Sequence, residues 1–225
     1  MMVDSGIFAD REEAGRLLAK ELLHFKDQEP VVLALPRGGV PVAVEVADAL
    51  HAPLDLILVR KIGAPWQPEL AIAAVVDGDR PETVVNQEIV DQLGIGDRYL
   101  KEQKARELAE IERRRELYLA DRPRARLVGR TAIVTDDGIA TGATMQAALH
   151  AIRRAQPKCL VLAVPVAPPD TIERLRHEVD EVVCLLRPAA FGAISLFYAD
   201  FHQITDDEIV AMLDRTATVE LVVTP

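Results

Sequence analysis

The sequence contains few cysteines, few histidines and no long apolar run. Its two cysteines, Cys159 and Cys184, each lie within an apolar stretch, so we interpret both as reduced thiols of the core. The five histidines are scattered without the spacing of metal ligands, which gives little support to a zinc site or to a nucleophile activated by histidine. No segment reaches the roughly 18–20 apolar residues that a membrane helix requires. No membrane partner is therefore expected.

The chain also lacks an excess of positive charge and a secretory start. A formal net charge of -10 argues against nucleic-acid binding by the whole surface, because phosphate contacts need clustered Lys and Arg. The first residues, MMVDSGIFADREE, are acidic where a secretory signal would have a basic start and an apolar run. We expect a soluble, cytoplasmic protein. Its 225 residues, 49% of them hydrophobic, predict a single domain over residues 1–225.

What the sequence does contain is an alternation of apolar strands and amphipathic helices. The predicted strands lie within residues 30–39, 54–59, 130–138, 158–167 and 180–186, and the predicted helices at 10–26, 40–51, 141–155 and 169–178. Such alternation predicts an α/β fold with a doubly wound, mostly parallel sheet and helices on both faces. Ligands of such sheets bind outside the carboxyl ends of the strands.

A stretch between the two halves departs from this rhythm. Residues 70–77 and 83–85 resemble strands, and residues 97–119 predict one long helix, within a helical insertion at 78–126. Residues 98–126 contain ten Lys and Arg against six Asp and Glu. A solvated helix with ion pairs such as Glu102/Arg106 and Glu110/Arg114 is one interpretation, and an oligomer contact or an anion-binding face is the other.

The most specific motif is IVTDDGIATGATM, at residues 133–145. An apolar strand delivers two adjacent carboxylates, Asp136 and Asp137, and a turn of small residues then leads into a helix. Main-chain N–H groups and the helix N-terminus favour an anion there, and Thr141 and Thr144 add hydroxyl donors. A capped helix alone would explain the Thr and Gly residues but not the paired carboxylates, which repel unless a ligand, metal or hydrogen bonds offset them. The pattern predicts a phosphate monoester beside a polyhydroxyl group, with Mg²⁺ close to the carboxylates.

Two other phosphate-binding motifs do not fit the sequence. A nucleotide P-loop needs a Lys after its second glycine, and none is present. A dinucleotide fold needs G-x-G-x-x-G after its first strand, where this chain has Arg37-Gly38-Gly39.

With its DDGIATGAT motif the sequence resembles the type I phosphoribosyltransferases, over about residues 10–215. The resemblance implies that Asp136 and Asp137 hold the ribose hydroxyls of 5-phosphoribosyl-1-pyrophosphate (PRPP) and the Mg²⁺ ion, and that they take part in catalysis. It assigns the 5-phosphate to Ala140, Thr141, Gly142, Ala143 and Thr144. It further implies that Arg37, Gly38 and Gly39 grip pyrophosphate, commonly through a strained and often cis peptide.

The next basic residues are Arg60 and Lys61. The stretch VRKIGAPWQPELAIAAV resembles the start of the mobile loop in adenine and orotate members of the family. Two cations there would neutralise the departing pyrophosphate, with Lys61 as a catalytic residue, whereas a solvated charge pair is the alternative. The loop around Gly63, Pro65 and Trp66 is expected to close over the substrate and exclude water.

The proton acceptor and the acceptor site are less defined. Members specific for 6-oxopurines carry an acidic residue where this chain has Ala140. Adenine-type members have alanine there and use a glutamate of the mobile loop, which makes Glu69 the catalytic candidate, against a solvated glutamate. Residues 187–201 resemble the hood of these enzymes, within a hood and C-terminal helix at 187–225. Phe197 and Tyr198 are candidates to stack on a planar acceptor, with core packing as the alternative.

The resemblance implies Mg²⁺-dependent transfer of a phosphoribosyl group from PRPP to a nitrogenous acceptor, preferably a nucleobase, with release of pyrophosphate. It also implies nucleotide salvage and a homodimer. The alternative is a PRPP-sensing regulator of the same fold that binds RNA or DNA through the basic helix at 98–126. Arg60, Lys61 and the PRGG loop favour catalysis. No residue pattern selects among purine, pyrimidine and amide acceptors.

Overall fold

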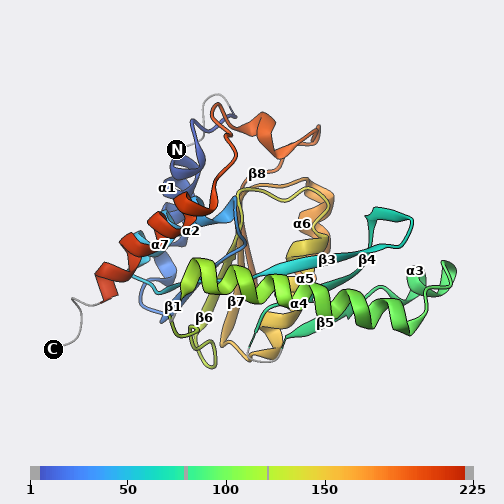
Figure 1. Ribbon diagram of the computed structural model, residues 1–225. Helices are drawn as coiled ribbons and strands as arrows, with labels where there is room; N and C mark the ends of the chain where they lie inside the picture. Colours follow the sequence, from blue (N-terminus) through green and yellow to red (C-terminus); the bar gives the residue numbers. More distant parts are fainter. Residues whose placement is uncertain (1–5, 79–80, 121, 221–225) are drawn as a thin grey trace.

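The computed structural model describes residues 6–78, 81–120 and 122–220, and its centre is a five-stranded parallel sheet (Figure 1). The strand order is β2-β1-β6-β7-β8. The strands are β1 (Pro30–Ala34), β2 (Leu54–Leu56), β6 (Thr131–Thr135), β7 (Cys159–Val166) and β8 (Glu181–Leu186). All five run parallel, which confirms the predicted α/β fold.

Helices cover both faces of this sheet. One face carries α1 (Arg11–Leu22) and α2 (Gly39–Leu50), and the other carries α5 (Ala143–Arg154) and α6 (Pro169–Leu175). Successive strand residues point to opposite faces, so Val32 of β1 packs toward α1 and α2, whereas Leu33 packs toward α5. Because both faces are covered, the central strands are buried and, apart from Thr131 and Thr135 at the ends of β6, almost entirely apolar.

A second, antiparallel sheet lies beside the first. It consists of β3 (Val59–Ala64), β4 (Gln67–Val76) and β5 (Glu82–Val85), in that order, and β3 contacts both α4 (Asp97–Leu119) and α5. The predicted single strand at 54–59 is wrong, because the chain leaves the main sheet after Leu56 and begins β3 at Val59. Ile57 and Leu58 are buried where the chain passes between the sheets, so no polar turn marks the change.

The stretch between the two halves of the fold combines strand and helix. Residues 78–126 contain β5, α3 (Gln87–Gln92) and α4, so this segment is not helical throughout. The predicted long helix at 97–119 is confirmed. On α4, Glu110 accepts hydrogen bonds from Arg113 and from Arg114, at 2.8 and 2.7 Å. The predicted Glu110/Arg114 pair is therefore present.

The C-terminal segment returns over the carboxyl ends of the strands. A short 3-10 helix (Ile194–Phe197) precedes α7 (Asp206–Glu220), which packs on α2 and α4. Two further 3-10 turns extend α1 and α6, at Leu23–Phe25 and Arg176–Glu178. Within the described ranges, no helix has the length and apolar character needed to cross a membrane.

Candidate functional site

Two carboxylates follow the buried strand β6 at its carboxyl end. All five residues of β6 are buried, and Asp136 and Asp137 come directly after them. The main-chain N–H of Asp137 donates to Oδ1 of Asp136 over 2.8 Å. The acidic pair thus lies at the edge of the sheet where α/β proteins bind their ligands.

Burial raises the pKa of both carboxyl groups. For Asp136, loss of solvent is the largest cause, and the charge of Asp137 raises the pKa further. For Asp137, burial also raises the pKa, whereas the guanidinium of Arg11, which donates to Oδ2 over 2.8 Å, lowers it. Such a pair favours a cation or hydroxyl donors beside it, because these stabilise the ionised form.

The turn after the acidic pair presents main-chain N–H groups to solvent. Ala140, Thr141 and Ala143 are exposed, and in the described chain the N–H groups of residues 140–145 have no hydrogen-bond partner. Gly142 has a φ of +79°, which favours glycine. Helix α5 begins at Ala143, so its N-terminus adds partial positive charge. The turn is open and suited to an anion.

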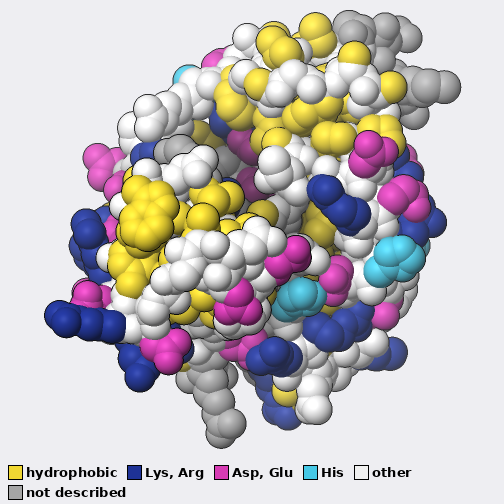
Figure 2. Space-filling view, turned by 90° about the vertical axis from the view of Figure 1, so that its right-hand side faces the viewer, with side chains coloured by type: hydrophobic (Ala, Val, Ile, Leu, Met, Phe, Trp, Pro, Cys, Tyr) yellow, Lys and Arg dark blue, Asp and Glu magenta, His cyan; other side chains and the backbone are white. Residues whose placement is uncertain are grey.

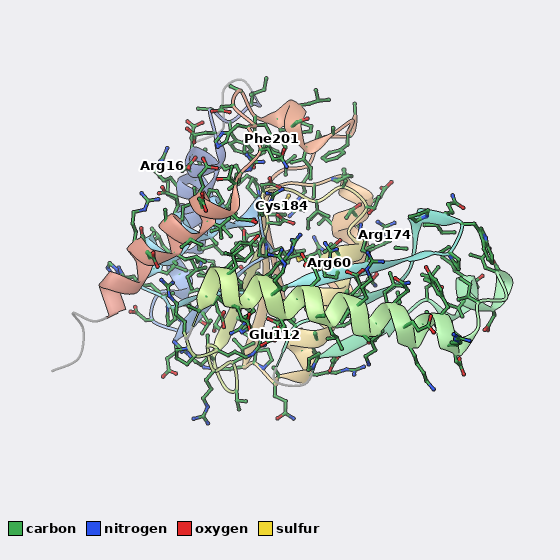
Figure 3. The ribbon with its side chains drawn as sticks, in the orientation of Figure 1. Arg16, Arg60, Glu112, Arg174, Cys184 and Phe201 are labelled. Atoms are coloured by element: carbon green, nitrogen blue, oxygen red, sulfur yellow. The ribbon has the colours of Figure 1, made fainter. Side chains whose placement is uncertain are left out.

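Helix α6 supports this turn from behind. Oγ1 of Thr171 donates to the carbonyl oxygen of Ala140 over 2.8 Å, and Nη2 of Arg174 donates to that of Thr141 over 2.9 Å. Figure 3 shows Arg174 beside α6. The C=O and N–H of a trans peptide point in opposite directions, so the N–H groups that follow these two carbonyls point away from α6.

The loop between β1 and α2 lies against the acidic pair. A Cβ atom at Gly38 would be 2.1 Å from Oδ2 of Asp137, and one at Gly39 would be 2.9 Å from Cα of Asp136. Only glycine permits this approach at both positions. The residues predicted to grip pyrophosphate and those predicted to hold ribose are therefore neighbours, although about 100 residues separate them in the chain.

A small cavity opens beside these glycines. Its volume is about 340 Å³, and its lining consists of Arg11, Arg37, Gly38, Asp137, Phe201, His202, Gln203 and Ile204. The peptide bond between Pro36 and Arg37 is cis, in line with the resemblance. The Arg37 side chain lies 3.8 Å from Asp206, at the start of α7. The cavity is where a ligand of the acidic pair would meet the C-terminal segment.

Arg11 lies at this site although its sequence context did not indicate it. It is the first residue of α1, and in an amphipathic helix a charged residue at that position is typical of a solvated face. Its side chain is only 8% exposed and contacts Asp137. Phe201 and Ile204, which line the cavity, were also not candidates, because their apolar character indicates core packing equally well.

The hood places its two candidate acceptor residues differently. Tyr198 is buried, and its hydroxyl donates to the main-chain oxygen of Asp137, so it supports the acidic pair from within the protein. Phe197 is half-buried and stacks on Phe191, with ring centroids 5.4 Å apart. Of the two, only Phe197 is partly exposed.

Arg60 and Lys61 lie inside β3, not in a loop that follows a strand. Nε of Arg60 donates to Oε2 of Glu107, on α4, over 2.8 Å, and Figure 3 places Arg60 near the middle of the molecule. Lys61 is exposed. The side chain of Glu69, the candidate proton acceptor, lies outside the described part of the structure.

The expected mobile loop is the tip of a hairpin formed by β3 and β4. The strands pair up to Ala64 and Gln67, with a register shift at Gly63, and the tip projects from the molecule (Figure 1). Trp66 at the tip is 71% exposed. Figure 2, which views the side that bears the hairpin, shows hydrophobic side chains gathered over the hood at the top and again at the left, with a hollow between them.

The acidic pair has the donor set for Mg²⁺. The described residues contain no group of three or more His, Cys, Asp or Glu side chains that could hold a metal ion. Asp136 and Asp137 would therefore supply at most two protein ligands. Mg²⁺ commonly binds through one or two carboxylates, with substrate phosphates and waters as its other ligands. The raised pKa of Asp136 also fits, since a cation would offset the repulsion that contributes to it.

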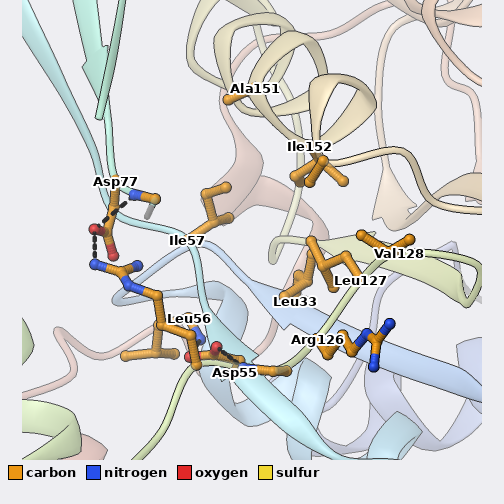
Figure 4. Close-up of a pocket in the computed structure, with 14 residues that line it drawn as sticks. Leu33, Asp55, Leu56, Ile57, Asp77, Arg126, Leu127, Val128, Ala151 and Ile152 are labelled. Carbon is orange, nitrogen blue, oxygen red and sulfur yellow. Dashed lines mark hydrogen bonds and ion pairs between the residues drawn. The ribbon is translucent and has the colours of Figure 1, made fainter. Parts of the chain in front are cut away.

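A larger cavity of about 530 Å³ lies near the opposite end of α5 (Figure 4). Its apolar lining includes Leu33 and Ile152. On one side Asp77 accepts hydrogen bonds from Arg124 at 2.6 Å and from Arg115 at 3.0 Å. These ion pairs connect β4 to α4 and to the segment before β6. We interpret this cavity as a structural junction separate from the acidic pair.

Comparisons with known proteins agree with this geometry. The model of the phosphoribosyl transferase domain family matches residues 9–202. Proteins from two strains of Mycobacterium tuberculosis, both named provisionally as phosphoribosyl transferases, are 46% identical over 209 residues, which is 93% of this chain and 47% of each relative. The chain thus spans about half the length of the curated relatives it matches. The crystal structure of TT1426 from Thermus thermophilus is 44% identical, with a TM-score of 0.79, over 92% of this chain and 97% of that chain.

Proposed function

The chain belongs to the phosphoribosyl transferase domain family, and we propose that it transfers the phosphoribosyl group of PRPP to a nitrogenous acceptor and releases pyrophosphate. One observation carries the proposal: an acidic pair, half-buried at Asp136 and buried at Asp137, precedes an open turn whose N–H groups, at residues 140–145, are without partners in the described chain. Carboxylates accept from hydroxyl groups and bare N–H groups bind phosphate, so this combination suits a sugar phosphate.

Each group of site residues binds a different part of PRPP. Asp136 and Asp137 accept hydrogen bonds from the ribose hydroxyls, and the turn at 140–144 binds the 5-phosphate. The loop of Arg37, Gly38 and Gly39 lies close enough to the acidic pair to hold pyrophosphate on the same sugar, which supports its assignment. Asp136 and Asp137 would hold Mg²⁺, which would supply positive charge to the departing pyrophosphate.

The proposal also assigns roles to two residues of the hairpin, Lys61 and Glu69. Lys61 is exposed on β3, and we assign it to the departing pyrophosphate, which it would approach when the hairpin closes. Arg60 contributes less, because Glu107 already neutralises its charge. Glu69 would take the proton of the acceptor. A planar nucleobase is the preferred acceptor, since Phe197 and Phe191 offer stacked rings in the hood.

Calorimetry and turnover test the proposal in two steps. PRPP titrated into the protein with Mg²⁺ should give saturable heat, and Asp136→Asn should abolish most of it. Asp48→Asn, which removes an exposed carboxylate on α2, is the matched control and should bind PRPP as the original protein does. Release of pyrophosphate is then measured over a panel of purines, pyrimidines and amides. If Mg²⁺ and PRPP gave no heat, the assignment of the PRPP site would be wrong. If they gave heat but no acceptor was turned over, the proposed transferase activity would be wrong.

The regulatory alternative has weaker support. On α4, Arg113 and Arg114 bind Glu110, and Arg115 is buried against Asp77, so these arginines do not form a free basic face. Lys101 and Arg106 are exposed on the same helix and are the proper residues to test. If an RNA bound tightly, and Lys101→Glu with Arg106→Glu abolished that binding while no acceptor was turned over, the regulator would replace the enzyme.

A further inference from the structure

Arg11 is fixed on Asp137 by several contacts at once. Its Nε donates to Oδ2 of Asp137 over 2.8 Å, and its Nη1 donates to the carbonyl oxygen of His202 over 3.0 Å. The guanidinium carbon lies 3.8 Å from the centroid of the Phe201 ring, in cation–π geometry. The Arg11 and Asp137 side chains are 8% and 10% exposed. Both charged groups are therefore shielded from water.

Two segments that are far apart in the sequence pair with each other to build this arrangement. The N–H of Phe8 donates to the carbonyl of Phe197 over 2.9 Å, and the N–H of Ala199 donates back to the carbonyl of Phe8 over 2.8 Å. The N–H of Asp200 donates to the carbonyl of Ala9, also over 2.8 Å. We call residues 8–11 and 197–202 together the end pair. The end pair places Arg11 against the ring of Phe201 and the carbonyl oxygen of His202.

The end pair also contacts the main chain of Asp137. The hydroxyl of Tyr198 donates to the carbonyl oxygen of Asp137, while Arg11 holds its carboxylate. Backbone and side chain of Asp137 are thus both held by the end pair. No donor from another described residue binds its Oδ1, which leaves that oxygen for a ligand.

We propose that Arg11 is a positioning residue for the Asp137 carboxylate, and that the end pair determines through it how tightly the site holds PRPP. The inference rests on the proposed function, since it assumes that Asp137 binds the ribose. The Asp137 carboxylate is nearly enclosed, and Arg11 donates to its Oδ2 from a side chain that is itself nearly enclosed. The guanidinium, with its planar set of donors, fixes the orientation of the carboxylate.

A purely structural ion pair would behave differently from a positioning residue. Loss of a structural pair lowers the fraction of folded protein, but the folded molecules that remain bind PRPP with the original Kd. Loss of a positioning residue raises the Kd and the KM for PRPP in the folded molecules, and kcat changes less, because ground state and transition state both use the ribose contact. The Kd of the folded fraction therefore separates the two.

The experiment compares Arg11→Gln, Arg11→Lys and Phe201→Leu by PRPP calorimetry with Mg²⁺ and by steady-state kinetics. The matched control is Arg115→Gln, which breaks the 3.0 Å pair with Asp77, where the side chains are 11% and 2% exposed. That pair is similarly buried but joins α4 to the residue after β4, away from the acidic pair. The control should lose stability and keep its Kd for PRPP.

Arg11→Gln should raise the Kd about 10–100-fold, the usual effect of removing a partner that orients a ligating group. Arg11→Lys should restore part of the affinity, since lysine keeps the charge but not the planar donors. A Kd for folded Arg11→Gln equal to that of the original protein overturns the inference and leaves the proposed function intact. If Arg11→Gln does not fold, Phe201→Leu decides: a raised Kd supports the inference and an unchanged Kd overturns it. No binding by the original protein overturns both.

Discussion

Thr171 lies directly behind Gly142: its Cγ2 atom would be 2.9 Å from a Cβ atom at residue 142. Gly142 also has a φ of +79°, which side chains other than glycine rarely adopt. Two independent constraints, one from the backbone and one from α6, thus require glycine in the turn that we assign to the 5-phosphate.

Gly142→Ala should therefore affect both stability and ligand binding. The left-handed conformation costs an alanine about 1–2 kcal/mol, and the contact with Thr171 should displace the turn and raise the Kd for PRPP by about 10-fold or more, as misplaced binding groups do. Urea unfolding and calorimetry with Mg²⁺ measure the two effects.

Gly129→Ala is the matched control for that variant. Gly129 has a similar φ of +76°, but no atom lies within 4 Å of the position of its Cβ. It should lose a similar amount of unfolding free energy and bind PRPP normally. If the Gly142→Ala and Gly129→Ala proteins had equal affinities for PRPP, the turn would not be part of the phosphate site.

The acidic pair and its turn could be predicted because they are local in sequence. A buried strand, two carboxylates, small residues and a helix start are all contained in residues 133–145. Arg11 could not be found this way, because it contacts Asp137 across 126 positions of the chain. Its role depends on the pairing within the end pair, and no periodicity in the sequence predicts that pairing.

The passage from β2 to β3 shows a different limit of sequence interpretation. Residues 54–59 are apolar apart from Asp55, yet they belong to two sheets. Burial of Ile57 and Leu58 between the sheets keeps the pattern apolar, so hydrophobicity alone could not divide it. Arg60 consequently lies within β3 and pairs with α4, where a loop facing pyrophosphate was expected.

The two members of the acidic pair should differ in how their substitution by asparagine affects the unfolding free energy. Burial and the charge of Asp137 raise the pKa of Asp136, so its ionised form is unfavourable in the folded protein without ligand. Asp136→Asn should leave the unfolding free energy in EDTA unchanged or increased. Asp137→Asn leaves Arg11 without its carboxylate partner and should cost about 3–5 kcal/mol.

Both variants should still lose function, with kcat/KM for PRPP reduced about 10²-fold or more, as when one preorganised electrostatic contact is lost. Urea unfolding in EDTA, paired with pyrophosphate release in Mg²⁺, gives the comparison. If the Asp136→Asn protein unfolded more readily than the Asp137→Asn protein, the charge of Asp136 would not destabilise the folded protein.

Trp66 is the single tryptophan of the chain and reports directly on the hairpin tip. Its side chain is 71% exposed, so acrylamide should quench its fluorescence efficiently in the free protein. If the hairpin closes over the site, Mg²⁺ with PRPP and an acceptor should shift the emission to shorter wavelength and reduce quenching. PRPP with EDTA is the control. Unaltered quenching in a saturated complex would show that the tip does not close.

The two cysteines should react slowly with iodoacetamide at pH 8. Burial raises the pKa of the Cys159 thiol, with Asp180 and Glu181 adding to the effect, and burial likewise raises the pKa of Cys184. Only the thiolate reacts, and a raised pKa means that less thiolate is present at a given pH. The alkylation rate should therefore keep rising with pH beyond about 8.5, the pH at which an ordinary cysteine is half ionised.

Cys184 should be the slower of the two, because its thiol also donates to the carbonyl oxygen of Leu186 over 3.2 Å, a bond that only the protonated form can make. Mass spectrometry of Cys159→Ser and Cys184→Ser proteins, each with one thiol left, measures the two rates separately. The same measurement in urea gives the rate of an unprotected thiol and is the control. A Cys184 that reacted in the folded protein as fast as in urea would mean that β8 does not protect its thiol as the hydrogen bond and burial require.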